Sequence, residues 1–259
     1  MPLNEHIKVL EGFAASHYGD DEAVNKALRL KLDHSLKVLE HAEHLVEGEQ
    51  ITGHLGYLCK LAALYHDIGR FPQFARYQTF NDRESTNHGR QGVLTLRALN
   101  LPGELSSNDW RTIRFAIGQH NVKNTRPTLP KHLTTITHLV RDADKLDIYR
   151  IMLAHFTSDT PDPAVTFDLD MSLDKYSEEI LDTVMAGETG DYSKIRFAND
   201  FKLLIIGWMN DFEFKTSFKL LEKREYFQQL FDLLPKNEKI QALAEKTNNF
   251  MRYKLNTPS

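Results

Sequence analysis

Histidine and aspartate residues at a few positions are the part of this sequence most able to do chemistry. His66 and Asp67 are adjacent at the end of an apolar segment. His34 lies on an apolar stripe of one helical segment, and Asp144 lies on a similar stripe of another. A lone carboxylate that faces a core is costly unless a positive group meets it. Two imidazoles and two carboxylates from separate helices therefore predict a binding site for a divalent transition metal.

The elements that must position these four groups are helices. Apolar residues recur at intervals of three and four residues, which is the helical period. The predicted helices cover residues 21–46, 55–68, 88–101, 109–119, 132–156, 173–185, 191–210, 215–234 and 238–253. The polar segment 70–87 is predicted to be a connection. Because no segment alternates apolar and polar residues as a strand would, the expected fold class is all-α.

One break in the helical period indicates how the chain is organised. Residues 157–170 (TSDTPDPAVTFDLD) contain prolines and no helical pattern. We predict a metal-binding helical core over residues 1–156. Residues 157–259 are predicted to form a helical extension that packs on this core, because they carry Trp208 and many phenylalanines.

Composition excludes several functional classes. The chain has 259 residues, of which 41% are hydrophobic and 26% are charged, as in soluble globular proteins. Its single cysteine, Cys59, cannot form an internal disulfide or a cysteine-built metal site. The net charge of -4 offers no broad basic field for nucleic acid or anionic membrane. The N-terminus lacks the apolar core of a secretory signal. We expect a cytoplasmic protein that contacts neither membranes nor extended nucleic acid.

The order of these residues resembles that of a known superfamily. His34, then His66 and Asp67, then Asp144 follow the order found in the HD superfamily of metal-dependent phosphohydrolases. The segments HDIGRF and RDADKLD are similar to those of small bacterial members, most of them uncharacterised. The resemblance covers about residues 25–150. It implies a helical HD-domain core, to which the C-terminal helices are an addition.

Two further histidines extend the resemblance to the dinuclear branch of the superfamily. His88 opens a helical segment in NHGRQG, and His120 closes one in GQHN. The family places the aspartate of the HD pair, here Asp67, between two metals. Adjacent Cα atoms are ~3.8 Å apart, which is comparable with the ~3.5–4 Å between the ions of two-metal sites. The resemblance assigns the ligands of two divalent ions (Mn, Fe, Co, Ni, Mg or Zn): His34, His66, Asp67 and Asp144 for the first, and Asp67, His88 and His120 for the second.

The resemblance implies hydrolysis of a phosphate ester. Two divalent ions can provide a hydroxide near neutral pH and hold phosphoryl oxygens for attack. The charge that develops needs positive donors, and Arg70 and Lys145 directly follow the ligand motifs. We expect Asp67, Arg70 and Lys145 to be catalytic, and Arg70 and Lys145 also to bind substrate. Further candidates for the phosphate pocket are Arg76, Arg90 and Lys123. The expected substrate is a small phosphate-bearing molecule, with a nucleotide as the first choice.

Several alternatives stay open at this point. Mixed-valent di-iron oxygenases of the HD type use an almost identical ligand set, and a nucleotide-binding sensor would need no turnover. The general acid is left open, because a metal-bound water, Asp82 or Glu84 would serve. Asp147 orients a ligand or lies on the surface, and His41 is a partner of the site or part of the core. A homodimer is left open.

Overall fold

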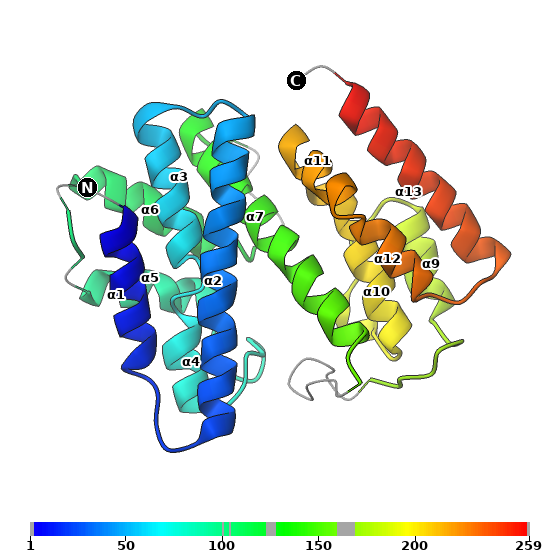
Figure 1. Ribbon diagram of the computed structural model, residues 1–259, viewed down its shortest axis with the longest axis horizontal. Helices are drawn as coiled ribbons and strands as arrows, with labels where there is room; N and C mark the ends of the chain where they lie inside the picture. The colour runs from blue at the N-terminus through cyan, green and yellow to red at the C-terminus, as the bar shows by residue number, and fades with distance from the viewer. Residues whose placement is uncertain (1–2, 100, 104, 123–127, 160–168, 258–259) are drawn as a thin grey trace. The chain divides into compact units, whose positions relative to one another are not determined.

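The computed structural model describes residues 3–99, 101–103, 105–122, 128–159 and 169–257. Within these ranges the regular secondary structure is helical, apart from one β-bridge between Asp170 and Phe197. This confirms the all-α prediction. The chain divides into two compact units, Met1–Asp147 and Ile148–Ser259 (Figure 1). The predicted boundary after residue 156 and the packing of the extension on the core stay predictions.

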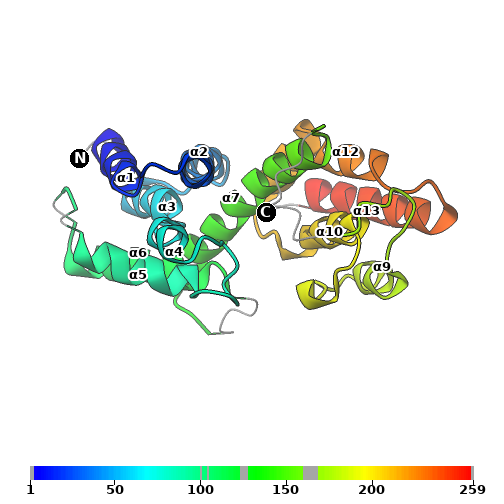
Figure 2. The same ribbon diagram turned by 90° about the horizontal axis from the view of Figure 1, so that it is seen from below.

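The N-terminal unit is built around a buried helix, α3. Its helices are α1 (Leu3–Ala15), α2 (Glu22–Gly48), α3 (Gly53–Tyr65), α4 (Arg70–Tyr77), α5 (His88–Ala98), α6 (Ser107–Gln119) and the part of α7 (Lys131–Phe156) that ends at Asp147. α3 contacts α1, α2 and α6, and α5 pairs with α6 (Figure 2). Most side chains of α3 are buried, because neighbouring helices cover it on several sides. The His66-Asp67 pair that follows α3 therefore lies inside the unit.

Side-chain caps set where three of the site-bearing helices begin. α2 begins after Asp21, whose carboxylate accepts two backbone N–H groups. α5 begins after Asn87, whose side chain accepts one. α6 begins after Ser106, which forms a capping box with Asp109. Each cap bonds N–H groups of the first turn that have no acceptor within the helix.

One segment near the site differs from its prediction. Residues 70–77, expected in a polar connection, form α4. α3 ends at Tyr65, so His66 and Asp67 lie in the turn between α3 and α4. Pro72 is compatible with α4 because it lies in the first turn, where its missing N–H would have no acceptor within the helix.

The turn after the His66-Asp67 pair approaches α5 closely, and Gly69 makes this approach possible. A Cβ atom on Gly69 would lie 2.3 Å from the carbonyl oxygen of His88 and 2.4 Å from the amide nitrogen of Gly92. Both distances are far inside van der Waals contact. The approach therefore requires glycine at this position, and it brings the start of α5 next to the pair.

The C-terminal unit has an aromatic core, and its helices are short apart from α7 and the last helix of the chain. Its helices are the last part of α7, α9 (Glu178–Met185), α10 (Ala198–Gly207), α11 (Lys215–Lys223), α12 (Tyr226–Asp232) and α13 (Glu238–Asn256), with 3-10 turns at Tyr192–Lys194 and Trp208–Asp211. The buried ring of Tyr149 contacts the rings of Trp208, Phe212, Tyr226 and Phe227.

The C-terminal helices differ in extent from their predicted ranges. The predicted helix 215–234 is two helices, because Glu225 has a left-handed backbone with a φ of 53°. No glycine or proline marks this break in the sequence. The predicted helix 173–185 begins only at Glu178, and the predicted helix 191–210 is α-helical only over α10. None of the helices in the described part of the chain is long and apolar enough to cross a membrane.

Candidate metal centre

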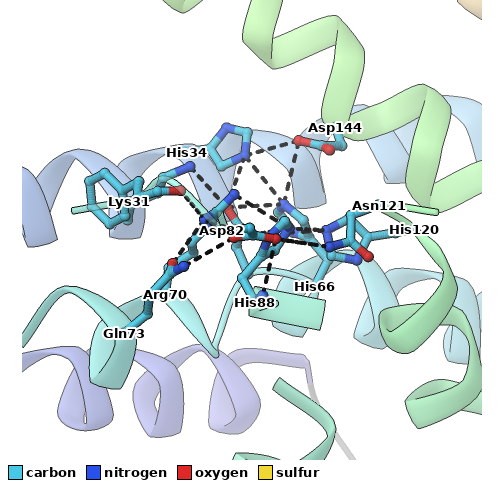
Figure 3. A network of polar contacts seen from close by, with 12 residues as sticks. Lys31, His34, His66, Arg70, Gln73, Asp82, His88, His120, Asn121 and Asp144 are labelled. Carbon is cyan, nitrogen blue, oxygen red and sulfur yellow. Dashed lines mark hydrogen bonds and ion pairs between the residues drawn. The ribbon is translucent and has the colours of Figure 1, made fainter. Parts of the chain in front are cut away.

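All six side chains predicted as metal ligands converge inside the N-terminal unit, although their elements are far apart in the sequence (Figure 3). They come from α2, the turn after α3, the start of α5, the end of α6 and α7: His34, His66, Asp67, His88, His120 and Asp144. The first five are buried. The side chain of Asp144 is 18% exposed, so the cluster reaches solvent there.

One half of the cluster joins α2, the turn after α3, and α7. The Nε2 atoms of His34 and His66 lie 3.2 Å apart. Oδ1 of Asp144 lies 3.1 Å from Nε2 of His34 and 3.5 Å from Nε2 of His66. The ligand atoms of these three residues all lie within 4.8 Å of one another. They are close enough to share one ion.

The other half joins the same turn to α5 and α6. The Nε2 atoms of His88 and His120 lie 3.0 Å apart. Oδ1 of Asp67 is 3.6 Å from the first and 3.9 Å from the second. Oδ2 of Asp67 faces the first half, 3.7 Å from Nε2 of His34 and 3.8 Å from Nε2 of His66. The two oxygens of one carboxylate thus face two groups of imidazole nitrogens. His66, Asp67 and His120 also form a compact group by themselves.

Hydrogen bonds on the far side of two imidazoles define where their lone pairs point. Nδ1 of His66 donates to the carbonyl oxygen of Ala63 at 2.8 Å, and Nδ1 of His120 donates to that of Ile117 at 2.6 Å. A carbonyl oxygen can only accept, so both Nδ1 atoms carry the proton. In the neutral ring, each Nε2 atom then has a lone pair that faces the cluster.

Carboxylates hold the other two imidazoles in the same way. Nδ1 of His34 lies 2.7 Å from Oδ2 of Asp147, and Nδ1 of His88 lies 2.7 Å from Oδ2 of Asp82. Each Nδ1 atom donates to its carboxylate, so these Nε2 atoms also face the cluster. The lone pairs of His88 and His120, on nitrogens 3.0 Å apart, repel unless a cation lies between them. The donor set therefore fits divalent metal ions.

The environment favours neutral imidazoles in the half formed by α5 and α6. Burial lowers the pKa of His120 to about 3, and burial also lowers the pKa of His88. His34 differs, because its hydrogen bonds to Asp144 and Asp147 outweigh burial and raise its pKa. A neutral imidazole is the form that binds a metal. His34, between two carboxylates, is placed to attract a cation.

Two carboxylates of the cluster are held in the ionised form. Burial alone would raise the pKa of both Asp67 and Asp144. The charges of Lys31 and His66 outweigh burial and hold the pKa of Asp67 well below its usual value. Hydrogen bonds to His34 and His66 do the same for Asp144. Both carboxylates are therefore ready to bind a cation at neutral pH.

A comparison with known families agrees with this geometry. The model of the HD domain matches residues 32–149, a range that contains all six predicted ligands. The N-terminal unit carries an HD domain. HD domains bind divalent metal ions, and their family is one of metal-dependent hydrolases. The resemblance to the HD superfamily is thereby confirmed, and the dinuclear ligand set stays a prediction. No curated protein and no solved structure matches the chain.

Arg70 of the HD domain, predicted to be a substrate-binding residue, lies next to Asp67. Its Nε atom is 3.5 Å from Oδ1 of Asp67. Its NH1 atom donates to three oxygens, those of the Gln73 side chain, the Phe80 carbonyl and the Asp82 carboxylate. These bonds hold the guanidinium beside the cluster.

Lys31, one residue before the matched range, also contacts the cluster, and the sequence analysis missed it. Its Nζ atom donates to Oδ2 of Asp67 at 3.0 Å (Figure 3). A signal was available, because Lys31 precedes His34 by three residues and the two share one face of α2. One turn of helix carries both a cation and an imidazole to the same carboxylate.

The other basic candidates are placed as follows. Lys145 follows Asp144 in α7 and is partly buried. Arg76 is exposed in the last turn of α4, and Arg90 is exposed in the first turn of α5. Lys123 lies outside the described residues. For these four side chains, binding of substrate stays a prediction.

Asp82 orients the HD domain's cluster and is unsuited to act as its general acid. Its oxygens lie 2.9 Å and 2.7 Å from Nδ1 of His88, and it accepts from Arg70, Gln73 and Asn121. Burial favours the neutral acid, but the hydrogen bond to His88 outweighs burial and lowers the pKa of Asp82 to about 2. A group that is ionised at neutral pH has no proton to give.

Asp147 has the position expected of an orienting residue. It is fully buried and bonded to His34, and Nε2 of His41 lies 3.9 Å from its other oxygen. His41 is therefore a neighbour of the carboxylate behind the cluster. Glu84, the other candidate acid, is exposed and accepts from Asn81.

Proposed function

We propose that this protein is a dinuclear metal-dependent phosphohydrolase that cleaves a phosphate ester of a small molecule. The observation that carries the proposal is the position of Asp67. Its Oδ2 atom faces the Nε2 atoms of His34 and His66, and its Oδ1 atom faces those of His88 and His120. A carboxylate between two groups of imidazole donors suits two ions that share a ligand.

The residues that would hold the ions form two sets with Asp67 in common. The sets are His34, His66, Asp67 and Asp144 for one ion, and Asp67, His88 and His120 for the other. When bound, divalent ions supply a hydroxide near neutral pH and neutralise charge on the phosphoryl group. The chain itself orients the donors, because each imidazole is tied through Nδ1 to a carbonyl or a carboxylate. Burial of Asp67 keeps bulk water away from the shared carboxylate.

Positive side chains next to the cluster would bind and orient the phosphate. The Arg70 guanidinium is held beside Asp67, where it can meet the charge that develops on a phosphoryl oxygen. Lys145 is proposed for the same task because it follows Asp144. The whole chain has a net charge of -4, so a phosphate must be attracted by such local cations. Nucleotides are the first substrate class to test.

Metal analysis combined with a phosphate-release screen tests the proposal. The protein is purified without added metal, its metal content is measured by mass spectrometry, and nucleotides are screened for phosphate release with Mn²⁺. We expect two metal equivalents per chain and a release of phosphate that disappears in Asp67→Asn. Asp20→Asn is the matched control, because Asp20 is exposed ahead of α2, and it should keep both properties.

Two outcomes would contradict the proposal. Iron in the purified protein, with substrate-dependent oxygen uptake and no phosphate release, would favour a di-iron oxygenase. The ligand set alone does not separate these reactions, because imidazole and carboxylate suit iron and manganese alike. Tight nucleotide binding with neither activity would favour a sensor.

A further inference from the structure

Two cations beside Asp67 have hydrogen-bond donors that the described residues do not satisfy. Nζ of Lys31 has one acceptor among them, Oδ2 of Asp67 at 3.0 Å, although an ammonium group has three donors. Nε of Arg70 is buried without a hydrogen-bond partner in that part of the chain. Oδ1 of Asp67 lies 3.5 Å from it, too far for a good bond. An unmet donor on a buried cation is costly, so Nε of Arg70 indicates a missing acceptor. The partly exposed Lys31 has further donors beside the same carboxylate.

Phe80 keeps these two cations close together. Its ring centroid is 5.3 Å from Nζ of Lys31 and 5.8 Å from Cζ of Arg70, within the range of cation–π attraction. The ring packs on Phe74 with centroids 4.4 Å apart. The carbonyl oxygen of Phe80 also accepts from NH1 of Arg70 at 2.6 Å. The pair of cations is therefore a supported arrangement, with its charges directed at Asp67.

The cations lie where the cluster approaches solvent. The side chains of Lys31 and Arg70 are 19% and 13% exposed, whereas that of Asp67 is 4% exposed. Both cations are thus more accessible to an anion from solvent than Asp67 is. NH2 of Arg70 also lies 3.4 Å from Nε2 of His88, so the guanidinium spans from the shared carboxylate to the second half of the cluster.

We propose that Lys31 and Arg70 form a subsite for one terminal oxygen of a phosphate monoester, and that the site prefers monoesters to diesters. The inference rests on the proposed function, in which metal ions hold the other phosphoryl oxygens. A monoester is a dianion with three terminal oxygens. A diester is a monoanion with two, because its third oxygen carries a second carbon substituent. That substituent would leave the donors of Lys31 and Arg70 unmet, which is a strong basis for rejection.

Phosphate binding by the manganese-loaded protein tests the subsite without turnover. Inorganic phosphate is titrated into the wild-type protein, Lys31→Met and Lys31→Arg, and metal content is measured for each. We expect Lys31→Met to keep its metal and to weaken phosphate binding about 10- to 100-fold, the range for loss of a hydrogen bond to a charged group. Lys31→Arg should recover part of the affinity. Lys37→Met is the matched control, because Lys37 pairs with Glu40 on the exposed face of the same helix.

Two results of this titration would overturn the subsite. Unchanged phosphate affinity in Lys31→Met, with the metal retained, would mean that Lys31 does not touch phosphate. Loss of metal from both Lys31 variants would mean that Lys31 acts by holding Asp67 in place. A thermal unfolding curve for each variant separates both results from a failure to fold.

A pair of chromogenic substrates tests the preference for monoesters. We expect the wild-type protein to have a higher kcat/KM for 4-nitrophenyl phosphate than for bis(4-nitrophenyl) phosphate, and Lys31→Met to lower the first value more than the second. Faster cleavage of the diester would overturn the preference while leaving the proposed function intact. If the protein cleaves neither substrate and no nucleotide, yet binds phosphate in a way that depends on Lys31, the subsite stands and the proposed function fails.

Discussion

The two units of the chain both bury charged side chains, but they satisfy them in different ways. In the C-terminal unit, Asp200 is fully buried at the start of α10. Its carboxylate accepts from the backbone N–H groups of Ser177, Arg196 and Phe197 and from the hydroxyl of Ser177. Every bond ties a loop to a helix end, so this carboxylate has a structural role.

Neighbouring polar groups of α10 are satisfied in the same manner. The amide of Asn199 donates to three carbonyl oxygens, those of Ser172, Leu173 and Lys175. Nζ of Lys202 donates to the side chain of Asn199 and to the carbonyl oxygen of Leu233. Most of these hydrogen-bond partners are backbone atoms, which are part of the fold and cannot be replaced by a ligand.

The N-terminal unit shows the opposite arrangement. The Nε2 atoms of His88 and His120 face each other, and the partners of the Asp67 carboxylate among the described residues are cations and imidazoles. On the side that faces the cluster, these groups have each other's charges and lone pairs as neighbours, whereas backbone carbonyls hold His66 and His120 from behind. Burial of charge is thus common to both units, and the identity of the partners separates a binding site from a structural network.

The largest effect should come from Asp67→Asn, which tests whether the charged cluster of the N-terminal unit is a binding site. Loss of one carboxylate charge removes the ligand that both metal sets share. We expect phosphate release to fall at least about 10³-fold. This loss is larger than the loss of about 10- to 100-fold that is typical when a residue that hydrogen-bonds to a metal ligand is replaced. Kinetics and metal content check the fall. If the metal-free variant also unfolds much more readily than the metal-free wild type, Asp67 is structural and the contrast with Asp200 disappears.

Asp200→Ala tests whether the buried carboxylate of the C-terminal unit has a structural role. Removing this carboxylate leaves buried N–H groups without an acceptor, so we expect the free energy of unfolding to fall by about 3 kcal/mol. Metal content per folded chain should not change, because Asp200 belongs to the C-terminal unit. Urea unfolding followed by circular dichroism measures the first quantity. Asp232→Ala, at an exposed pair with Lys236, is the control and should be nearly neutral.

Asp82→Asn should have an intermediate effect confined to one half of the cluster. An amide holds Nδ1 of His88 less well than a carboxylate, so we expect metal affinity to fall about 10- to 100-fold. The loss should concern one metal equivalent, because the half formed by His34, His66 and Asp144 does not contact Asp82 in the described bonds. Stepwise metal titration measures the two equivalents separately, and an equal loss of both would contradict the division into halves.

The smallest effect is expected from Lys202→Met, the counterpart of Lys31→Met. The buried ammonium loses water on folding, and burial lowers its pKa, so its removal partly offsets the lost hydrogen bonds. We expect the free energy of unfolding to fall by about 1 kcal/mol and phosphate binding to stay unchanged. Lys31→Met should show the reverse, weaker phosphate binding and little change in unfolding. Identical behaviour of the two variants would remove the distinction between the units.

Periodicity was sufficient for most of the fold, whereas the ligand series was implied by the resemblance to the HD superfamily. It predicted the long helices α2 and α7, because the spacing of their apolar residues fits the helical period and no other. It failed at α4, where Pro72 and charged residues resemble a loop, and at Glu225, where a left-handed residue breaks a helix without glycine. Local propensity cannot show such features when packing decides them.

The sequence by itself determined which donors exist, their order along the chain and the helix faces of His34 and Asp144. Only the tertiary structure decided that Asp67 presents its two oxygens to different imidazoles, that Asp82 lies behind His88, and that Lys31 reaches the shared carboxylate. The physical reason is that helical period sets the direction of a side chain about its own axis, whereas the distance between axes depends on packing. Here the close approach at Gly69 contributes to that distance, and no spacing of residues encodes it.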